Sequence, residues 1–255
     1  DFSTIMTDII PDYELIGKSQ CFPLYWYEKI ERKAQQTFDF MSGDDEYVRH
    51  DGISDFILKQ FRQAIGPKAS KEDIFYFVYA ALHHPGYRAK FAADLKKQLP
   101  RLPVPVSMDD YRLMVKVGRD LAALHLHYED IEGYGLKEVW TGAAADARPY
   151  RVTKMSWGKK GKDEDRSKIV VNGALTLEGI PAKAHEYVVN GRSALEWIID
   201  RYQIRTDKDS GITNDPNDWG REHGNPRYIV DLIQSVTTVS VKTVDLVKKL
   251  EGVGK

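Results

Sequence analysis

The spacing between apolar residues changes along the chain, and this change restricts the fold more than any other feature of the sequence. Between residues 52 and 126 the apolar side chains recur every three or four positions, which is the spacing of one face of a helix. Between residues 150 and 177 the spacing falls to two, as in a half-buried strand. Helical spacing returns from residue 194 and continues nearly to the end. We therefore predict an α+β fold with a helical lobe, a short antiparallel β-meander and a long C-terminal helix that closes it.

The first part of the chain is predicted to be extended and then helical. Residues 12–28 are rich in aromatic and aliphatic side chains and indicate two short strands. A helix is expected over residues 52–64, and Ser70 predicts the N-cap of a second helix that ends at a Pro-Gly pair. An apolar stripe over residues 87–99 indicates another helix, which would pack against the second as an αα-hairpin. A further helix is expected over residues 107–125.

A three-stranded meander is expected in the second part of the chain. Its strands are predicted at residues 150–155, 168–171 and 174–177. Residues 158–167 would form the exposed first turn, and Asn172-Gly173 would form the second as a type I′ turn, in which both central residues have positive φ. A helix is expected over residues 194–202. Asn225 and Pro226 are then expected to supply the N-cap and the first residue of the last helix.

The helical and β-containing parts are expected to be two lobes of one domain. Residues 133–148 are rich in Gly and Ala with little periodicity, so the boundary is placed there. The N-terminal lobe would cover residues 1–135 and the C-terminal lobe residues 145–255. The sequence opens at Asp1 without a methionine and ends in a Gly-rich stretch, so we expect it to be a segment of a longer polypeptide.

The cysteine content and the hydropathy pattern favour a cytoplasmic protein. Cys21 is the single cysteine and has no partner within the chain, which is typical of a reducing compartment. No apolar run approaches the roughly 20 residues that a transmembrane helix needs, and no basic and apolar leader precedes a cleavage site. We therefore expect no membrane partner.

The overall charge does not favour nucleic-acid binding, but the charges are unevenly distributed. The formal net charge is −1, whereas binding to phosphates requires Lys and Arg. Residues 88–101 nevertheless hold five basic side chains against Asp94 alone, namely Arg88, Lys90, Lys96, Lys97 and Arg101. Residues 148–168 are similarly basic, and acidic side chains gather between Asp39 and Asp55. Such blocks predict a basic face and an acidic face.

The sequence lacks the common motifs of catalytic and cofactor sites. It contains no GxGxxG or GxxxxGK[ST] loop for a dinucleotide or nucleoside triphosphate, and no GxSxG, HExxH or paired CxxC motif. The N-P-P-Y type motif of amino-methyltransferases is also absent. We therefore predict no catalytic centre and no cofactor in this segment.

Two groups of polar residues resemble metal ligands but do not have the required spacing. His83-His84 and the pair His125 and His127 diverge on a helix, and no second cluster supports them. They are interpreted as structural or surface residues. The stretch 207–218 is rich in Asp and Asn but lacks the DxDxDG order of a calcium loop, so it is interpreted as a turn built by Asx side chains.

A lysine-rich turn is the strongest local candidate for DNA contact. Lys159, Lys160 and Lys162 would lie at the exposed tip of the meander, where lysines often serve only to keep a sheet edge soluble. Further basic side chains and Trp157 lie beside them in the sequence, so the hairpin would present cations and an aromatic ring together. Ribbons of this kind can enter a DNA groove.

Long stretches of the sequence resemble one protein family. These stretches are Gln20–Tyr27, Asp73–Arg88, Phe91–Pro103, Gly118–Glu129, Tyr150–Met155, Tyr187–Tyr202 and Thr206–Trp219. In this order they are similar to the C-terminal specificity domain of type ISP restriction-modification enzymes. The similarity covers nearly the whole chain, and each stretch is longer than a short motif.

The resemblance implies a parent polypeptide with nuclease, helicase-like ATPase, adenine methyltransferase and target-recognition parts, of which this chain would be the last. The ATP, magnesium and S-adenosylmethionine of the family would bind the other parts, and no catalytic residue is carried over to this chain. The implied function is sequence-specific recognition of double-stranded DNA. The methyltransferase and helicase-like domains of the same polypeptide would be its protein partners, and they would carry out adenine methylation and restriction on the positioned target.

The predicted DNA-binding residues combine the meander with the first basic block. They are Arg88, Lys90, Arg151, Lys154, Trp157, Lys159, Lys160, Lys162, Arg166 and Lys168. Arg88 and Lys90 are expected to anchor phosphates, while one sequence does not separate base contacts from phosphate contacts. An alternative is a docking module that couples neighbouring domains through the aromatic N-terminal segment. A metal-dependent nuclease is disfavoured because acidic residues and lysines do not fall at a catalytic spacing.

Overall fold

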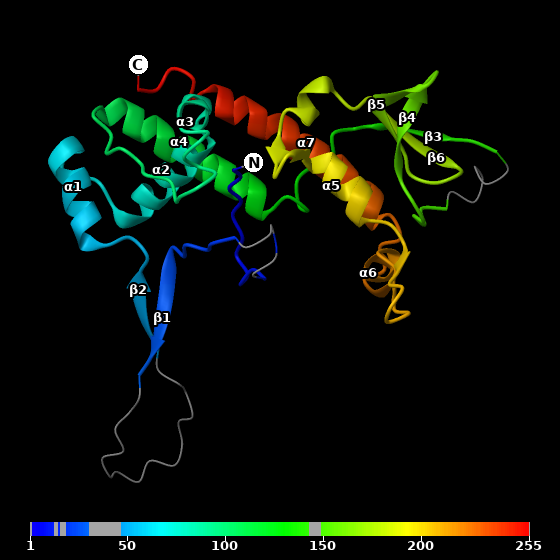
Figure 1. Ribbon diagram of the computed structural model, residues 1–255, viewed down its shortest axis with the longest axis horizontal. Helices are drawn as coiled ribbons and strands as arrows, with labels where there is room; N and C mark the ends of the chain where they lie inside the picture. Colours follow the sequence, from blue (N-terminus) through cyan, green and yellow to red (C-terminus); the bar gives the residue numbers. More distant parts are fainter. Residues whose placement is uncertain (1, 13–14, 16–18, 31–46, 143–148, 255) are drawn as a thin grey trace, which may run out of the picture.

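The computed structural model describes residues 2–12, 15, 19–30, 47–142 and 149–254. The molecule is elongated, with a helical lobe at one end and a β-sheet lobe at the other (Figure 1). Helix α7 (Tyr228–Lys248) runs along the molecule and joins the two lobes. This arrangement confirms the predicted α+β class and the long C-terminal helix.

A two-stranded ribbon projects from the helical lobe (Figure 1). Strand β1 (Tyr25–Lys29) pairs antiparallel with β2 (Tyr47–Asp51). Only β1 is a strand among the described residues of 12–28, and its partner lies further along the chain than predicted. The first predicted strand falls partly on residues 13–14 and 16–18, which lie outside the described residues. At the base of the ribbon the two chains approach closely, since a Cβ atom on Gly52 would lie 1.9 Å from the carbonyl oxygen of Pro23. Only glycine fits there.

Serine caps define three of the helices in the helical lobe. Helices α1 (Asp55–Ile65), α2 (Lys71–His83) and α4 (Met108–Leu126) begin directly after Ser54, Ser70 and Ser107. Each serine hydroxyl accepts a hydrogen bond from the backbone N–H three residues later, which satisfies a free donor of the first turn. The predicted caps at Ser70 and Ser107 are confirmed.

Helices α2 and α4 pack against each other at close range. A Cβ atom on Gly118 of α4 would lie 1.9 Å from the carbonyl oxygen of Tyr76 on α2, so the glycine permits the backbones to approach. Phe77 of α2 and Tyr111 of α4 are also buried between the two helices, with ring centroids 5.8 Å apart. The pair forms the centre of the helical lobe.

The predicted helix over residues 87–99 is wrong in its extent. Helix α3 (Pro85–Lys90) has six residues, and residues 91–98 continue as turns. The apolar stripe predicted this segment to pack against α2, but Leu99 is 50% exposed. A helix of this length depends on tertiary packing, and the stripe lacks a buried face beyond Lys90.

The second lobe contains a four-stranded antiparallel sheet with the order β3-β6-β5-β4. Its strands are β3 (Lys137–Trp140), β4 (Ser156–Lys160), β5 (Asp163–Val170) and β6 (Leu175–Glu178). The predicted first strand at 150–155 is wrong. The backbone N–H and C=O of Val152 instead form hydrogen bonds of 2.8 Å and 2.7 Å with the side-chain amide of Asn217. β3 was not predicted.

The two Asn-Gly pairs of this lobe adopt different turns. Neither Asn172 nor Gly173 has positive φ, so the predicted type I′ turn is wrong, although the pair does connect β5 and β6. The Asn172 side chain accepts hydrogen bonds from the N–H groups of Ala174 and Leu175 instead. In contrast, Asn190 and Gly191 have φ values of 49° and 80°. They connect β7 (Val188–Val189) to β8 (Arg192–Ser193).

Short elements complete the second lobe before α7. They are the 3-10 helix η2 (Ala182–His185), α5 (Ala194–Arg201), β9 (Arg205–Thr206), β10 (Thr213–Asn214) and α6 (Asn217–Glu222). Helix α7 starts at Tyr228, later than predicted, because Asn225 accepts a hydrogen bond from the N–H of Arg227 in a turn before the helix. Pro226 therefore precedes the helix.

Each lobe has its own hydrophobic core, and α7 contributes to both. Ile229, Val230 and Ile233 near its start pack with the sheet of the second lobe. Leu246 and Leu250 at its other end pack with the helical lobe. Burial of each large side chain stabilises the fold by roughly 1.5–3 kcal/mol. No helix in the described ranges is long and apolar enough to cross a membrane.

Candidate nucleic-acid interface

The β4–β5 hairpin carries the most exposed group of predicted DNA-binding residues. Lys159 and Lys160 end β4, and Lys162 follows Gly161, whose φ of 67° forms the turn. The three lysine side chains and Lys154 are exposed. In the part of the chain that the structure describes, no ion pair joins Lys154, Lys159 or Lys162 to an acidic side chain. These cations are therefore available to neutralise phosphates.

Trp157 lies in the core rather than on the surface of the hairpin. Its side chain is 8% exposed, and its ring packs edge-on against His185 with centroids 5.3 Å apart. The Arg166 guanidinium covers another part of the ring at 5.8 Å from the centroid. The ring stabilises the end of the hairpin that lies opposite the turn. Because the ring is buried, it is not available to stack on a DNA base.

Three other predicted DNA-binding residues of this lobe are paired with acids. Lys168 of β5 lies opposite Glu178 of β6, with 2.9 Å between Nζ and the carboxylate oxygen, and this hydrogen bond raises the pKa of Lys168. Arg151 binds Asp215 at 2.6 Å. Arg166 binds Glu196 at 3.1 Å. These side chains neutralise neighbouring carboxylates, so they add little net positive charge to the surface.

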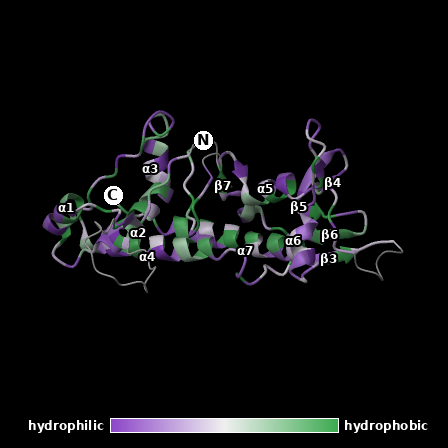
Figure 2. Cartoon of the chain, turned by 90° about the horizontal axis from the view of Figure 1, so that it is seen from below, coloured by the Kyte–Doolittle hydropathy of each residue, from purple (hydrophilic) through white to green (hydrophobic). Residues whose placement is uncertain are grey.

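Arg88 and Lys90 lie on α3 in the helical lobe, away from the hairpin. Figure 2 shows α3 and the β4–β5 hairpin in opposite halves of the molecule, both rising from the same side of α4 and α7. Arg88 donates a hydrogen bond of 2.5 Å to the carbonyl oxygen of Phe2. It is half-buried, and burial lowers its pKa. Lys90 is exposed, with its ammonium 5.4 Å from the centre of the Phe91 ring.

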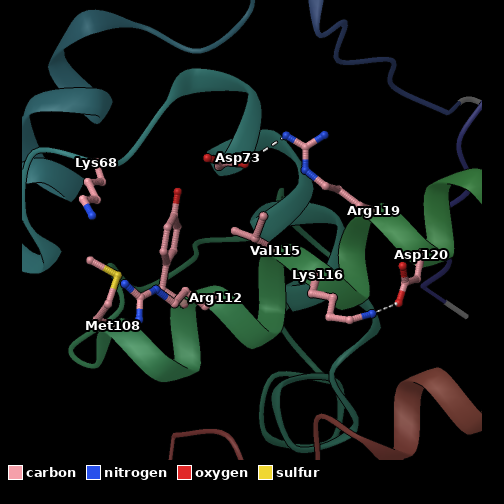
Figure 3. Close-up of a pocket in the computed structure, with 9 residues that line it drawn as sticks. Lys68, Asp73, Met108, Arg112, Val115, Lys116, Arg119 and Asp120 are labelled. Carbon is pink, nitrogen blue, oxygen red and sulfur yellow. Dashed lines mark hydrogen bonds and ion pairs between the residues drawn. The ribbon is translucent and has the colours of Figure 1, made fainter.

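A hollow between α2 and α4 was not indicated by the sequence (Figure 3). It has a volume of about 390 Å³ and is lined mainly by side chains of α4. Two of its cations are paired, since Arg119 binds Asp73 at 2.9 Å and Lys116 binds Asp120 at 2.8 Å. The hydroxyl of Tyr111 is buried without a hydrogen-bond partner among the described residues, and burial raises its pKa to about 12.

Two histidines of the helical lobe, His83 and His125, belong to a buried polar cluster at the junction with α7. The Tyr79 hydroxyl lies 2.7 Å from His125 Nδ1, and His125 Nε2 lies 2.8 Å from the Thr243 hydroxyl. His83 Nδ1 lies 2.8 Å from the carbonyl oxygen of Tyr79. Burial lowers the pKa of His83 to about 4 and that of His125 to about 3. The described residues contain no group of three or more His, Cys, Asp or Glu side chains that could hold a metal ion.

The acidic loop between β9 and β10 is an Asx turn, as interpreted from the sequence. The Asp207 carboxylate accepts hydrogen bonds from the backbone N–H groups of Asp209 and Ser210 at 3.1 Å and 2.8 Å. These bonds lower the pKa of Asp207, and the bond from Ser210 is the largest cause. The carboxylate thus stabilises the loop locally.

The β1–β2 ribbon presents exposed aromatic side chains. Tyr27 is 62% exposed and Tyr47 55% exposed. Trp26 stacks on His50 with ring centroids 4.1 Å apart, and the Arg49 guanidinium lies 4.3 Å from the centre of the Tyr25 ring. Tyrosine, tryptophan and arginine are the residues that protein interfaces favour. An isolated two-stranded ribbon is only marginally stable in water, so a binding partner would stabilise it.

Comparisons with known proteins identify relatives over nearly all of the chain. A family model described as the Type ISP C-terminal specificity domain matches residues 1–232. No curated protein matches. One solved structure is the ATP-dependent Type ISP restriction-modification enzyme LlaBIII bound to DNA, which is 36% identical with a TM-score of 0.80 over 99% of this chain. The chain covers 15% of that enzyme.

Two further structures resemble the chain. A nuclease-deletion mutant of the Type ISP restriction-modification enzyme LlaGI, in complex with a DNA substrate mimic, is 42% identical with a TM-score of 0.64. The match covers 80% of this chain and 14% of that one. The DrdV–DNA complex is 31% identical with a TM-score of 0.77 and matches 98% of this chain and 23% of that one. The chain thus spans less than a quarter of each of these proteins.

Proposed function

The chain belongs to the Type ISP C-terminal specificity domain family, and from this membership we propose that it recognises a specific sequence in double-stranded DNA for a larger restriction-modification enzyme. The observation that carries the proposal is the exposed lysine group of the β4–β5 hairpin. A relative also supports the proposal, because the structure of LlaBIII, which matches 99% of the chain, contains bound DNA.

The hairpin lysines are proposed to contact phosphates. Lys159, Lys160 and Lys162 share one turn, and Lys154 lies shortly before β4. Flexible lysines at a hairpin tip suit phosphate oxygens, whereas recognition of bases needs polar groups held in a fixed geometry. Because the net charge of the chain is −1, other parts of the parent enzyme would supply much of the nonspecific affinity.

Methylation and cleavage are proposed to occur elsewhere in the parent polypeptide. The sequence lacks the motifs that bind S-adenosylmethionine or ATP in the relevant enzyme classes. LlaBIII is described as ATP-dependent, and this chain covers 15% of it. In the proposal, this domain positions the target for adenine methylation and restriction by the neighbouring methyltransferase, helicase-like and nuclease parts.

A domain exchange tests the proposal. Residues 1–254 in the parent enzyme are replaced by the matching segment of a relative, and methylated adenines are mapped in DNA exposed to each enzyme. If this chain reads the sequence, the methylated site changes to that of the donor of the segment. Methylation of the original site by the chimera would contradict the proposal.

The exposed aromatic ribbon favours a second candidate function, which is docking between domains of the parent. Trp26, Tyr27 and Tyr47 would pack against a neighbouring domain. Replacing Tyr27 and Tyr47 with Ser would then weaken association between this domain and the rest of the enzyme, which limited proteolysis would detect as faster separation of the two parts. An unchanged cleavage rate together with weaker DNA binding would instead place the ribbon on DNA.

A further inference from the structure

Two of the basic residues expected on the DNA surface lie at the ends of a chain of contacts between the lobes. Resting on the function proposed above, we infer that Arg88 and Arg166 are positioning residues, which hold the β4–β5 hairpin in place relative to the helical lobe. The contact chain consists of Arg88, Phe2, Ser3, Asn190, Ser193, Glu196 and Arg166. Neither arginine is assigned to the DNA itself.

The first part of the contact chain joins the lobes through the N-terminal segment. Arg88 of α3 donates a hydrogen bond to the Phe2 carbonyl oxygen at 2.5 Å, and its guanidinium lies 5.9 Å from the centre of the Phe2 ring. The next residue, Ser3, accepts a hydrogen bond from the backbone N–H of Asn190 at 2.6 Å. Residues 2 and 3 therefore connect α3 of the helical lobe to the β7–β8 turn of the second lobe.

The β7–β8 turn, which receives this contact, has a restricted backbone conformation. Among the described residues, Asn190 is the only non-glycine residue with positive φ, and Gly191 follows it with φ of 80°. A turn with two left-handed residues fixes the path of both strands. Ser193 at the end of β8 is 2% exposed, and it caps α5 by a capping box with Glu196. The position of Glu196 is therefore fixed relative to the turn.

Glu196 completes the chain at the base of the hairpin. One carboxylate oxygen accepts the Ser193 N–H at 2.7 Å, and the other binds the Arg166 guanidinium at 3.1 Å. The carbonyl oxygen of Arg166 also lies 3.0 Å from His185 Nε2, and its guanidinium covers the buried Trp157 ring. Arg166 is thus held on several sides, and the lysine tip lies directly beyond it on the same strand pair.

The relative position of the two lobes affects sequence recognition more than nonspecific binding. Nonspecific affinity depends on the number of phosphates neutralised, which tolerates small displacements. Base recognition depends on hydrogen bonds in a defined register, which phosphate contacts and the protein framework set. Breaking the contact chain should therefore lower the ratio of specific to nonspecific affinity while leaving the phosphate contacts in place.

The salt dependence of binding separates a positioning residue from a phosphate contact. Each phosphate contact contributes about 0.9 to the slope of log K against log salt concentration for duplex DNA. If Arg88 bound a phosphate, its removal would reduce this slope by about 0.9. If Arg88 positions the hairpin, the slope stays the same and only the preference for the target falls.

The experiment uses the full parent enzyme with Arg88→Met, Arg166→Met or Ser3→Ala. Arg221→Met on α6 is the matched control, because that exposed arginine pairs only with the neighbouring Asp218 among the described residues. Affinity is measured over a range of salt concentrations for two duplexes. One carries the site found by mapping methylated adenines, and the other has the same composition in shuffled order.

We expect each of the three variants to lose several-fold in the ratio of target to shuffled affinity, with an unchanged salt slope. Ser3→Ala removes a single hydroxyl, so it remains informative if an arginine variant does not fold. Combining Ser3→Ala with Arg166→Met should cost less than the sum of the two, because both break one contact chain. A lower salt slope for Arg88→Met and Arg166→Met, or an unchanged affinity ratio for all three variants, would overturn the inference. A wild-type enzyme without preference for the target would instead overturn the proposed function.

Discussion

His125 Nε2 lies 2.8 Å from the hydroxyl of Thr243, and this contact joins helix α4 of the helical lobe to the long helix α7. Tyr187 of the second lobe stacks on the same imidazole, with ring centroids 5.3 Å apart and an interplanar angle of 14°. One buried histidine therefore contacts both lobes and the helix between them. Its protonation state should affect the stability of the whole molecule.

We predict that the protein loses stability as the pH falls below about 6.5. Burial holds the pKa of His125 at about 3 and that of His83 at about 4, below the value of an unfolded histidine. The unfolded chain then binds more protons than the folded one between these limits, so acid favours unfolding, by up to roughly 3 kcal/mol for each histidine at pH 4. Chemical denaturation from pH 7 to pH 4 measures this. His125→Gln should flatten the dependence, and His127→Gln on the exposed neighbouring position should not.

The lysine tip should control the salt dependence of DNA binding. Replacing Lys159, Lys160 and Lys162 with Ala in the parent enzyme should weaken binding to all duplexes and flatten the salt slope, by about 0.9 for each phosphate that a lysine no longer neutralises. Lys116→Ala is the control, since that lysine is paired with Asp120 on α4. A slope equal to that of the wild type would show that the tip does not meet the phosphates.

Gly118→Ala should destabilise the helical lobe strongly. The new methyl group would lie 1.9 Å from the Tyr76 carbonyl oxygen, so α2 and α4 would have to move apart. Forcing a group into a packed contact costs about 1–3 kcal/mol or more. Thermal unfolding of the variant tests this against Gly173→Ala, where a Cβ atom would meet nothing within 4 Å. Equal melting temperatures for the two variants would contradict the close approach of the helices.

Asn217→Leu should destabilise the second lobe by leaving the backbone of Val152 without hydrogen bonds. The Asn217 amide accepts from the Val152 N–H at 2.8 Å and donates to its C=O at 2.7 Å, and the Val152 side chain is fully buried. Each buried group left unpaired costs about 1–3 kcal/mol. Denaturant unfolding measures the loss. The exposed Asn214→Leu should change stability little, and a similar loss in both variants would argue against a specific role for Asn217.

Much of the helical lobe could be predicted because its signals are local. Ser70 and Ser107 cap their helices through bonds that span three residues, and these bonds depend little on the rest of the fold. The apolar stripe from Tyr87 to Leu99 led to a helix that was predicted too long. The spacing of apolar residues indicates a possible buried face, but it does not show whether another element covers that face. Likewise, residues 150–155 have the alternation of a strand, but the backbone N–H and C=O of Val152 form hydrogen bonds with the side chain of Asn217, which lies far away in the sequence.

The candidate site was likewise predictable only where it depends on residues that are close in the sequence. The lysines of the tip are neighbours in sequence, so their grouping on a turn followed from the turn itself. The partners of Arg88 and Arg166 are Phe2 and Glu196, which lie far away along the chain. A sequence shows that an arginine is present but not which carboxylate or carbonyl it will meet. Trp157 was placed on the surface for the same reason, since its neighbour His185 comes from η2.

Helix α7 contributes side chains to the cores of both lobes, from Ile229 at its start to Leu250 just beyond its end. The lobes are therefore not independent units. Recombination that exchanged one lobe would either replace half of the shared helix or leave that half mismatched with the core it packs against. A hybrid joined at residue 232, where the family match ends, would divide α7 after its first turn. Hybrids intended to transfer DNA specificity should keep the helix intact through Leu250, so that the residues that pack on both lobes come from the same parent protein.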